Sequence, residues 1–559
     1  MKLFDQVKGQ SPEFTLTRNG TVVEVLLNYD LSGWYDEEAG FYVYEGEALI
    51  SVGDTYNSVY QSHGGDRPLY MNFTASLTSG VTYQNEYTVT DWGDGTDVKF
   101  TFNTTLFSVK AEFTGTEAVD VVFGSVAGDV LSGGGGNDFI EGHTGHDVLD
   151  GGEGKDILYG GMGNDTYIVD DEGDQVIEAA GAGTDVVESS FSYYNLGANI
   201  EALTLTGSSS INGHGNSGAN VITGNVANNY LDGDAGADTL IGGKGDDSYR
   251  VENAGDVVVE NAGEGSDHVR SYITYELAAN IEKLTLDSGQ PVNGFGNTLD
   301  NYIWGSSSAN VLDGDAGNDN LYGDAGNDIL LGGDGDDYLT GGSGTDRLYG
   351  GSGSDKYLVD AFDRVIEAAG GGNDRVSCSA SFTLAAGAEV EALATSQSNG
   401  EIAINLTGNE FAQTVTGNDG NNVLSGAGGN DTLKGGGGAD KLLGGLGSDK
   451  LYGGSGADTF VFQTYQDNTL SVRDMIYDFS RQEGDRIDLS AIDANTKVAG
   501  NQAFTFIGEK AFSNKAGELR YVNANGDTYI HGDGDGDGTI DFSARLDTTI
   551  EFVKGDFIL

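Results

Sequence analysis

Two patterns of apolar residues alternate along this chain. In the first pattern, an apolar residue recurs every nine positions, at the eighth place of a repeat rich in glycine and aspartate. The repeats from Gly133 are GGGGNDFIE, GHTGHDVLD, GGEGKDILY and GGMGNDTYI. In the second, apolar and polar residues alternate over short stretches, as at Val257 and Val259 or at Leu284 and Leu286. A period of two indicates strands, and neither pattern has the period of an amphipathic helix. The sequence therefore predicts an all-β protein made of very short strands.

The nonapeptides form four blocks, each in a single phase. A degenerate copy at Gly124 precedes the first block at Gly133, and the later blocks begin at Gly215, Gly305 and Gly417. Glycines at positions 1, 2 and 4 permit positive φ and close backbone approach. Positions 7 to 9 form a short strand whose central side chain, at position 8, points inward. We expect two nonapeptides to make one coil of a right-handed parallel β-roll, with the apolar residues of position 8 stacked inside.

Position 6 of the nonapeptide is aspartate, or asparagine in the leading copies of a block. Stacked coils would hold these carboxylates at the strand spacing of roughly 4.8 Å. Two charges at that distance repel by about 0.8 kcal/mol in water and by about 3 to 4 kcal/mol at an effective dielectric constant of 20. A hard cation with six to eight oxygen ligands would relieve this repulsion, which favours Ca²⁺ over Mg²⁺ or Zn²⁺.

The predicted calcium ligands are the position-6 carboxylates together with carbonyl oxygens of the glycine turns. The carboxylates are those of Asp129, Asp138, Asp147, Asp156, Asp165, Asp238, Asp247, Asp319, Asp328, Asp337, Asp346, Asp355, Asp431, Asp440, Asp449 and Asp458. The carbonyls include those of Gly133, Gly151, Gly160, Gly332, Gly341, Gly350, Gly435 and Gly444. Asp533, Asp535 and Asp537 are weaker candidates, in an acidic hairpin tip or in an EF-hand-like loop that has Ala544 where a bidentate glutamate belongs.

The nonapeptides resemble the calcium-binding repeats of RTX proteins exported by type I secretion, over roughly residues 116–559. The resemblance implies that each ion lies between turns two repeats apart. Asp138 would then act with the turn of residues 151–156, and Asp319 with that of residues 332–337. Asparagine replaces aspartate at the start of blocks, where an amide supplies oxygen without charge, so we expect weak or empty sites at Asn220, Asn229, Asn310 and Asn422.

The last hundred residues resemble the C-terminal domain of serralysin-type proteases. In that family the exporter reads an acidic residue followed by three apolar ones at the extreme C-terminus, and Asp556, Phe557, Ile558 and Leu559 fit this pattern. The resemblance implies a chain that is exported unfolded and folds on meeting calcium outside the cell. The N-terminus has no apolar segment typical of a signal peptide, so export would take this route.

A longer unit, begun by TYIVDDEGDQVIE at Thr166, SYRVENAGDVVVE at Ser248 and KYLVDAFDRVIE at Lys356, separates the blocks. We interpret it as spacer coils that extend the core, with a dedicated ligand site as the alternative. The predicted organisation is an N-terminal sandwich or barrel-like domain (1–115), nonapeptide blocks (116–168, 215–250, 296–358, 408–461), spacers (169–214, 251–295, 359–407) and a C-terminal cap (462–559). The N-terminal region alternates as antiparallel strands, and its aromatic residues would form either an ordinary core or a sugar-stacking or self-assembly face: Trp34, Tyr35, Tyr42, Tyr44, Tyr56, Tyr60, Tyr70 and Trp92.

The composition of the chain indicates which partners and which kinds of site it can have. A formal charge of -61 repels nucleic acid and attracts multivalent cations. No stretch of 18 apolar residues is present, which excludes a membrane-spanning helix. One cysteine, Cys378, excludes an internal disulfide framework and a thiolate zinc cluster.

No enzymatic motif is found in the sequence. The six histidines never take the HExxH spacing of serralysins, and no G-x-S-x-G elbow occurs, so we expect neither a protease nor a lipase. His143 and His146 are expected to be solvated variable positions of a turn. The favoured hypothesis is an extracellular, calcium-loaded structural protein that assembles with itself as a surface layer, filament or biofilm matrix of a Gram-negative bacterium. The alternatives are an adhesin whose N-terminal domain binds a glycan, lipopolysaccharide or another surface, and a small hydrolase or lyase carried on a repeat stalk.

Overall fold

The computed structural model describes residues 13–18, 21–36, 41–52, 55–57, 81–90, 97–106, 112–117, 119–397 and 400–559. The chain forms two compact units, Met1–Ser266 and Asp267–Leu559. Within the described ranges the elements are strands joined by turns, apart from one 3-10 helix at Lys554–Asp556. No helix in this part of the chain is long and apolar enough to cross a membrane. The predicted all-β class is confirmed.

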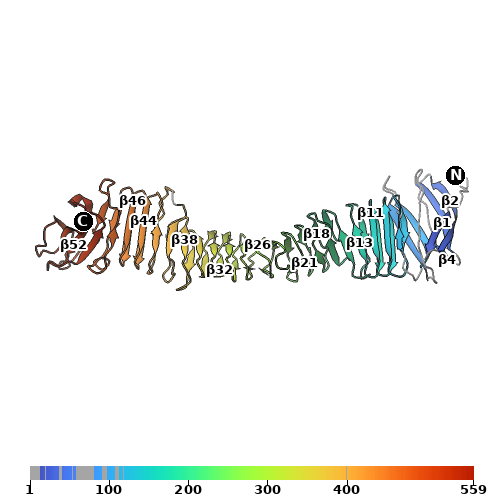
Figure 1. Cartoon of the computed structure of the whole chain (residues 1–559), viewed down its shortest axis with the longest axis horizontal. Coiled ribbons are helices and arrows are strands. Elements are labelled where there is room, and N and C mark those ends of the chain that lie inside the picture. The colour runs from blue at the N-terminus through green and yellow to red at the C-terminus, as the bar shows by residue number, and fades with distance from the viewer. Residues whose placement is uncertain are drawn as a thin grey trace. The chain divides into compact units, whose positions relative to one another are not determined.

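The first unit contains a parallel solenoid whose successive strands alternate between two faces (Figure 1). The first face is one sheet of β7 (Glu112–Thr114), β9 (Val130–Gly135), β11 (Val148–Glu153), β13 (Thr166–Val169), β15 (Val186–Ser189), β17 (Ala202–Leu205), β19 (Val221–Thr223), β21 (Thr239–Ile241) and β23 (Val257–Val259). The second face has β8 (Val121–Phe123), β10 (Phe139–Thr144), β12 (Ile157–Met162) and β14 (Gln175–Ile177), then β16 (Tyr193–Asn195), β18 (Asn212–His214), β20 (Tyr230–Asp232) and β22 (Ser248–Val251).

Register follows the nonapeptide phase. Leu131 of β9 lies beside Leu149 of β11, which lies beside Tyr167 of β13, and Ile140 of β10 lies beside Leu158 of β12. All five side chains occupy position 8 and are almost completely buried. Each buried side chain of this size contributes about 1.5 to 3 kcal/mol through removal of apolar surface from water. The predicted inward ladder at position 8 is therefore confirmed, and it is the core of the roll.

The second unit continues the same architecture. One face has β24 (His268–Ser271), β26 (Lys283–Leu286), β28 (Tyr302–Trp304), β30 (Asn320–Tyr322), β33 (Tyr338–Thr340), β36 (Lys356–Val359), β38 (Arg375–Cys378), β40 (Ala392–Thr395), β42 (Thr414–Thr416), β44 (Thr432–Gly437), β46 (Lys450–Ser455) and β48 (Met475–Ile476). The other face has β25 (Tyr275–Glu276), β27 (Gly294–Phe295), β29 (Val311–Asp313), β32 (Ile329–Asp334), β35 (Arg347–Ser352) and β37 (Arg364–Ile366), then β39 (Phe382–Thr383), β41 (Leu406–Thr407), β43 (Val423–Gly428), β45 (Lys441–Leu446), β47 (Thr459–Val461) and β49 (Arg486–Asp488). The short pair β31 (Ala325–Gly326) and β34 (Ser343–Gly344) lies in the turns.

Spacer segments add coils to the solenoid. β15 and β17 pair in sequence between β13 of the first block and β19 of the second. In the second unit, β38 and β40 pair in the same way between β36 and β42. Cys378 is completely buried in β38, as a small core residue. The core therefore continues through the segments that lack the glycine-aspartate pattern.

The N-terminal strands pair antiparallel, in agreement with their alternating sequence. β1 (Glu13–Arg18), β2 (Thr21–Asp36), β3 (Phe41–Val52) and β4 (Thr55–Asn57) form one sheet, and β5 (Val81–Thr90) pairs with β6 (Asp97–Leu106). The predicted aromatic face of this region lies outside the residues whose side chains are described. β7, placed in the N-terminal domain from the sequence, pairs parallel with β9 and already belongs to the roll.

The chain ends in an antiparallel meander of β51 (Glu518–Ala524), β52 (Asp527–Asp533) and β53 (Phe542–Leu546), preceded by β50 (Thr505–Gly508). The final strand, β54 (Phe557–Ile558), pairs with β49. Asp556 is buried, and Arg481 Nε donates a hydrogen bond of 2.9 Å to its Oδ1. The terminal residues are therefore part of the folded unit.

The inward ladder can be tested at two adjacent leucines of β32. Leu330 is completely buried at position 8, whereas Leu331 at position 9 is half-buried on the outer face. We expect Leu330→Ala to lower the free energy of unfolding by about 2 to 5 kcal/mol because it opens a cavity. Leu331→Ala should lower it by less than about 1 kcal/mol. Urea unfolding at saturating calcium measures both, and equal losses would contradict the assigned faces.

Candidate metal sites

Position-6 aspartates form hydrogen-bonded columns along the edges of the roll. Each lies directly before a strand, and, apart from that of Asp129, its Oδ1 accepts the backbone N–H of the equivalent residue one coil earlier. Asp138 Oδ1 accepts from Asp120 N at 2.7 Å, and Asp147 Oδ1 accepts from Asp129 N at 2.7 Å. The bond recurs at 2.6 to 2.8 Å for Asp156, Asp165, Asp238, Asp247, Asp319, Asp328, Asp337, Asp346, Asp355, Asp431, Asp440, Asp449 and Asp458.

The second oxygen of most of these carboxylates is buried without a hydrogen-bond partner. This holds for Oδ2 of Asp138, Asp147, Asp156, Asp165, Asp238, Asp319, Asp328, Asp337, Asp346, Asp355, Asp431, Asp440, Asp449 and Asp458. A buried, unsatisfied carboxylate oxygen is costly, and a column of them is costlier still. Asp129 differs, because Ser125 donates to both of its carboxylate oxygens.

The unpartnered oxygens face carbonyl oxygens of the neighbouring turn. A Cβ added at Gly133 would lie 2.2 Å from Asp138 Oδ2 and 2.6 Å from the Gly151 carbonyl oxygen. A Cβ at Gly314 would lie 2.2 Å from Asp319 Oδ2 and 2.6 Å from the Gly332 carbonyl oxygen. The pairs of turns implied by the resemblance are thus brought together, and glycine is required because any side chain would fill the space between the oxygens. Equivalent cradles, each with an unpartnered Asp Oδ2, hold the carbonyls of Gly160, Gly341, Gly350 and Gly444. The other two predicted carbonyls differ, because that of Gly435 lies beside the amide oxygen of Asn422 and that of Gly133 lies beside Asp120 Oδ2, which accepts hydrogen bonds from Thr116.

The electrostatics of the columns also indicate a missing positive charge. Burial, together with neighbouring carboxylates in the same column, raises the pKa of Asp138 and of Asp147 to about 8. Burial likewise raises the pKa of Asp319 and of Asp337 to about 7. Buried carboxylates with only oxygen neighbours suit a hard cation such as Ca²⁺. The site is a row of cradles, each with a carboxylate oxygen and a carbonyl oxygen, and the ligand role of each residue remains a prediction.

Amides replace carboxylates where a block begins. Asn220 Nδ2 donates to the carbonyl of Ile200 at 2.9 Å, and Asn220 Oδ1 accepts the N–H of Asn216 at 2.8 Å. Asn229, Asn310 and Asn422 make the same pair of bonds. The preceding coil presents a backbone carbonyl at this point. An asparagine Nδ2 can donate a hydrogen bond to it, whereas an aspartate carboxylate could not. Asn301 and Gln413 hold equivalent column positions that the sequence analysis missed, at position 6 of the degenerate leading nonapeptides that begin at Gly296 and Gly408.

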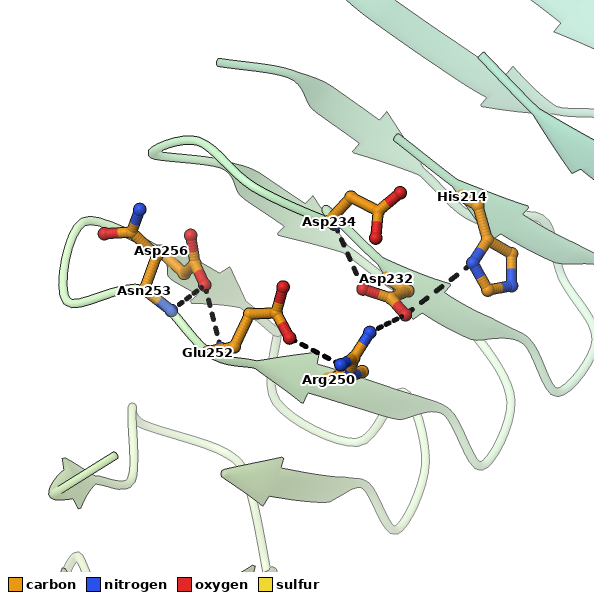
Figure 2. Close-up of polar contacts among 7 residues, drawn as sticks. All are labelled: His214, Asp232, Asp234, Arg250, Glu252, Asn253 and Asp256. Atoms are coloured by element: carbon orange, nitrogen blue, oxygen red, sulfur yellow. Dashed lines mark hydrogen bonds and ion pairs between the residues drawn. The ribbon is translucent and has the colours of Figure 1, made fainter. Parts of the chain in front are cut away.

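Columns end on aspartates of the spacers, which the sequence analysis also missed. Figure 2 shows Asp256, whose Oδ2 accepts the N–H groups of Glu252 and Asn253 at 3.3 and 3.0 Å. Asp256 Oδ1 accepts from Asp238 N at 3.2 Å, as in a block. Asp174 and Asp363 behave in the same way. In each, Oδ1 accepts the N–H of the column residue one coil earlier, and Oδ2 accepts N–H groups of its own turn. An aspartate followed by one polar residue and then two apolar residues, as in GDQVI or FDRVI, is the signal that could have identified them.

An outward ladder of charges lies beside this column end. His214, Asp232 and Arg250 are neighbours across β18, β20 and β22. Arg250 Nη1 lies 2.9 Å from Asp232 Oδ2, and His214 Nδ1 lies 3.6 Å from the same oxygen (Figure 2). Here a carboxylate is neutralised by side chains, in contrast to the position-6 columns, so this ladder does not require an ion.

One of the two histidine expectations is wrong and the other is confirmed. His143 is buried rather than solvated, with Nδ1 2.9 Å from Glu141 Oε1 and its ring stacked on Phe123. His146 is exposed and accepts the N–H of Asn164 at 2.7 Å.

The loop after β52 is an acidic hairpin tip. Asp533 accepts the N–H groups of Gly536 and Gly538 at 2.6 and 2.9 Å. Oxygens of Asp533, Asp535 and Asp537 lie within 4.8 Å of one another. The EF-hand alternative is wrong, because the flanking elements are the antiparallel strands β52 and β53, and Ala544 is buried in β53.

Comparison with known proteins agrees with this geometry. The family model "RTX calcium-binding nonapeptide repeat (4 copies)" matches residues 114–149, 132–167, 214–249, 295–330, 322–357, 407–442 and 425–460. The endo-1,3-1,4-beta-glycanase ExsH of Rhizobium meliloti (strain 1021) is 38% identical over 90 residues, which cover 16% of this chain and 19% of that enzyme.

Two solved structures are also similar to parts of the chain. The AlgE6R3 subunit of the Azotobacter vinelandii mannuronan C5-epimerase is 31% identical, with a TM-score of 0.19, over 25% of this chain and 71% of that one. The extracellular lipase LipA of Serratia marcescens is 16% identical, with a TM-score of 0.19, over 55% of this chain and 45% of that one. The chain thus spans about a fifth of the glycanase and under half of the lipase.

Removing the charge of three consecutive position-6 aspartates in the third block should weaken calcium-dependent folding. We expect the triple variant of Asp328, Asp337 and Asp346 to Asn to need several-fold more calcium for folding, because each cradle loses its carboxylate. The control is the triple variant of Asp315, Asp324 and Asp336 to Asn, which removes the same charge from exposed positions of the same block. Calcium titration followed by circular dichroism gives the midpoints. An equal shift in both variants would contradict the assigned ligands.

The raised pKa values predict how pH acts on the calcium-free protein. The unfolded aspartate has a pKa near 3.8, and folding raises it to about 7 or 8. The folded form therefore binds more protons, and the stability of the calcium-free roll is lost as pH rises through the folded pKa. We expect its thermal midpoint to fall between about pH 5 and about pH 8. Melting in calcium-free buffer measures this, and a midpoint that rises with pH would contradict it.

Proposed function

We propose that this chain, which is an RTX calcium-binding repeat protein, is a secreted structural protein that folds on calcium outside the cell and assembles with itself at the cell surface. Calcium, further copies of the chain and the type I secretion machinery are its proposed partners. A surface layer, a filament or a biofilm matrix are the forms of assembly considered.

The observation that carries this proposal is the set of unpartnered, buried Oδ2 atoms in the position-6 columns. A chain that must enclose so many carboxylates is unstable without cations and stable with them. Folding is then coupled to the calcium concentration of the compartment, which is low in cytosol and high outside. Such coupling suits a protein that crosses the envelope unfolded.

Self-assembly rests on the overall charge. The chain has 88 acidic and 27 basic residues, so copies repel one another unless cations intervene. Calcium that fills the roll would also lie between acidic outer faces of adjacent subunits. Rigid subunits with many exposed carboxylates are therefore suited to calcium-bridged polymers.

An adhesin is the second candidate, since its repeats would carry an N-terminal binding domain. The glycanase named above acts on glycans according to its name, which favours a carbohydrate as the adhesin's ligand. The expectation that the chain is not an enzyme stays a prediction, and hydrolysis or epimerisation of polysaccharide by the pure protein would overturn it.

Electron microscopy of dilute, pure protein tests the assembly. We expect ordered polymers when calcium is added and their loss when chelator follows, because the bridging ions are removed. Magnesium at the same concentration is the control for general charge screening. A chain that stays monomeric in calcium and binds a glycan array would favour the adhesin and contradict self-assembly.

A further inference from the structure

The last coil of a nonapeptide block differs from the coils inside it. In the interior, the cradle beside a position-1 glycine such as Gly133, Gly142, Gly314 or Gly332 holds an Asp Oδ2 and a glycine carbonyl oxygen. At Gly160, in the last coil of the first block, a Cβ would instead meet the Tyr167 hydroxyl, Asp165 Oδ2 and Glu178 Oε1. β12 pairs with β14 so that Tyr159 lies beside Ile177, which places Glu178 beside Gly160. A glutamate thus stands where the next glycine turn would be.

Three carboxylates converge at this position. Oxygens of Asp165, Glu178 and Asp185 lie within 4.8 Å of one another, and all three residues are buried. Asp165 and Asp185 have no exposed surface, yet Oδ2 of each lacks a hydrogen-bond partner. Asp185 Oδ1 is used by the column, where it accepts from Asp165 N at 2.8 Å. The unpartnered oxygens therefore point to a ligand that the protein itself does not supply.

A tyrosine holds the glutamate in place. Tyr167, at position 8 of the last strand, donates its hydroxyl hydrogen to Glu178 and accepts the N–H of Gly160 at 2.8 Å. Glu178 Oε2 also accepts the N–H of Ala179 at 3.1 Å. The carboxylate of Glu178 is consequently fixed beside those of Asp165 and Asp185 rather than turned to solvent.

The same arrangement recurs in the second unit, at the end of the third block. Oxygens of Asp355, Glu367 and Asp374 lie within 4.8 Å of one another, and the Tyr357 hydroxyl donates to Glu367. Asp374 Oδ1 accepts from Asp355 N at 2.9 Å. Oδ2 of Asp355 and Oε2 of Glu367 are buried without a partner.

The second block repeats the tyrosine–glutamate bond between Tyr249 and Glu260. The fourth block, which no spacer follows, has Phe460 where the others have tyrosine. The cluster therefore belongs to block ends that meet a spacer.

We propose that the carboxylates of Asp165, Glu178 and Asp185, and equally those of Asp355, Glu367 and Asp374, form calcium sites distinct from the nonapeptide cradles. An interior cradle combines an aspartate carboxylate with a neutral backbone carbonyl. In the block-end cluster, the carboxylate of Glu178 or Glu367 takes the place of that carbonyl. Affinity for Ca²⁺ rises with the number of charged ligands. The block-end sites therefore bind calcium more tightly than the interior ones and fill first. This deepens, and rests on, the proposed calcium loading of the roll.

Without a cation, the alternative is a proton retained within the cluster. Burial raises the pKa of Glu178 to about 7 and that of Glu367 to about 8. A cluster that keeps a proton in the presence of calcium would hold no ion, and this is a distinct outcome of the experiment below.

The decisive experiment uses crystals of the full chain grown with calcium and soaked in Tb³⁺, which gives anomalous scattering peaks. We expect peaks both in the nonapeptide turns and between Asp165, Glu178 and Asp185, with the block-end peaks present at the lowest Tb³⁺. Peaks in the turns but none at the block ends would overturn this inference and leave the proposed function standing. No peaks in either place would overturn the proposed function itself.

A variant gives the solution counterpart. We expect the double variant Glu178→Gln and Glu367→Gln to lose two tightly bound calcium ions per chain in calorimetry, or to bind them at least roughly tenfold more weakly. Glu201→Gln with Glu391→Gln is the control, because Glu201 and Glu391 accept the N–H groups of Asp185 and Asp374 from outside the clusters. Unchanged tight binding in the test variant would overturn the inference. If that variant fails to fold, the anomalous peaks of the unmodified chain decide.

Discussion

Inside the nonapeptide blocks, each coil is held to the next by a carboxylate whose two oxygens have different roles. One oxygen accepts a backbone N–H from the coil before, as in the bond from Asp138 N to Asp156 Oδ1. The other oxygen is buried and has no partner in the protein. The first role fixes the geometry of the column, and the second makes the column unstable unless positive charge is present. The glycine turns follow from the same constraint, since only glycine leaves room beside the second oxygen.

The residues at the two ends of each column limit the need for positive charge to the nonapeptide blocks. At the start, an amide such as Asn220 donates to the spacer carbonyl and leaves no unsatisfied oxygen. At the end of one column, Asp256 turns its second oxygen to the N–H groups of its own turn. The other column ends where Tyr167 and Glu178 add a carboxylate instead. At one edge of the roll the last carboxylate is therefore satisfied by backbone N–H groups, whereas at the other edge several carboxylates lie together.

The apolar core is independent of this charge and runs through blocks and spacers alike. Leu149 in a block and Val187 in a spacer are both completely buried in the same sheet. Core packing therefore provides continuity, and the carboxylate columns provide the dependence on cations. A protein built in this way can be kept unfolded at low calcium without any weakness in its core.

The nine-residue period by itself determined the class of fold, the inward position 8 and the columns of position 6, because each depends only on local geometry repeated in phase. It also placed Gly151 opposite Asp138 through the family resemblance. Glu178 could not be assigned in advance, because it lies in a segment without the glycine pattern and gains its role only when strand pairing sets it beside Gly160. His143 was misjudged for the same reason, since its burial depends on Phe123 of the preceding coil. Local periodicity fixes what every coil shares, whereas contacts between unlike coils are decided by the register of the stack.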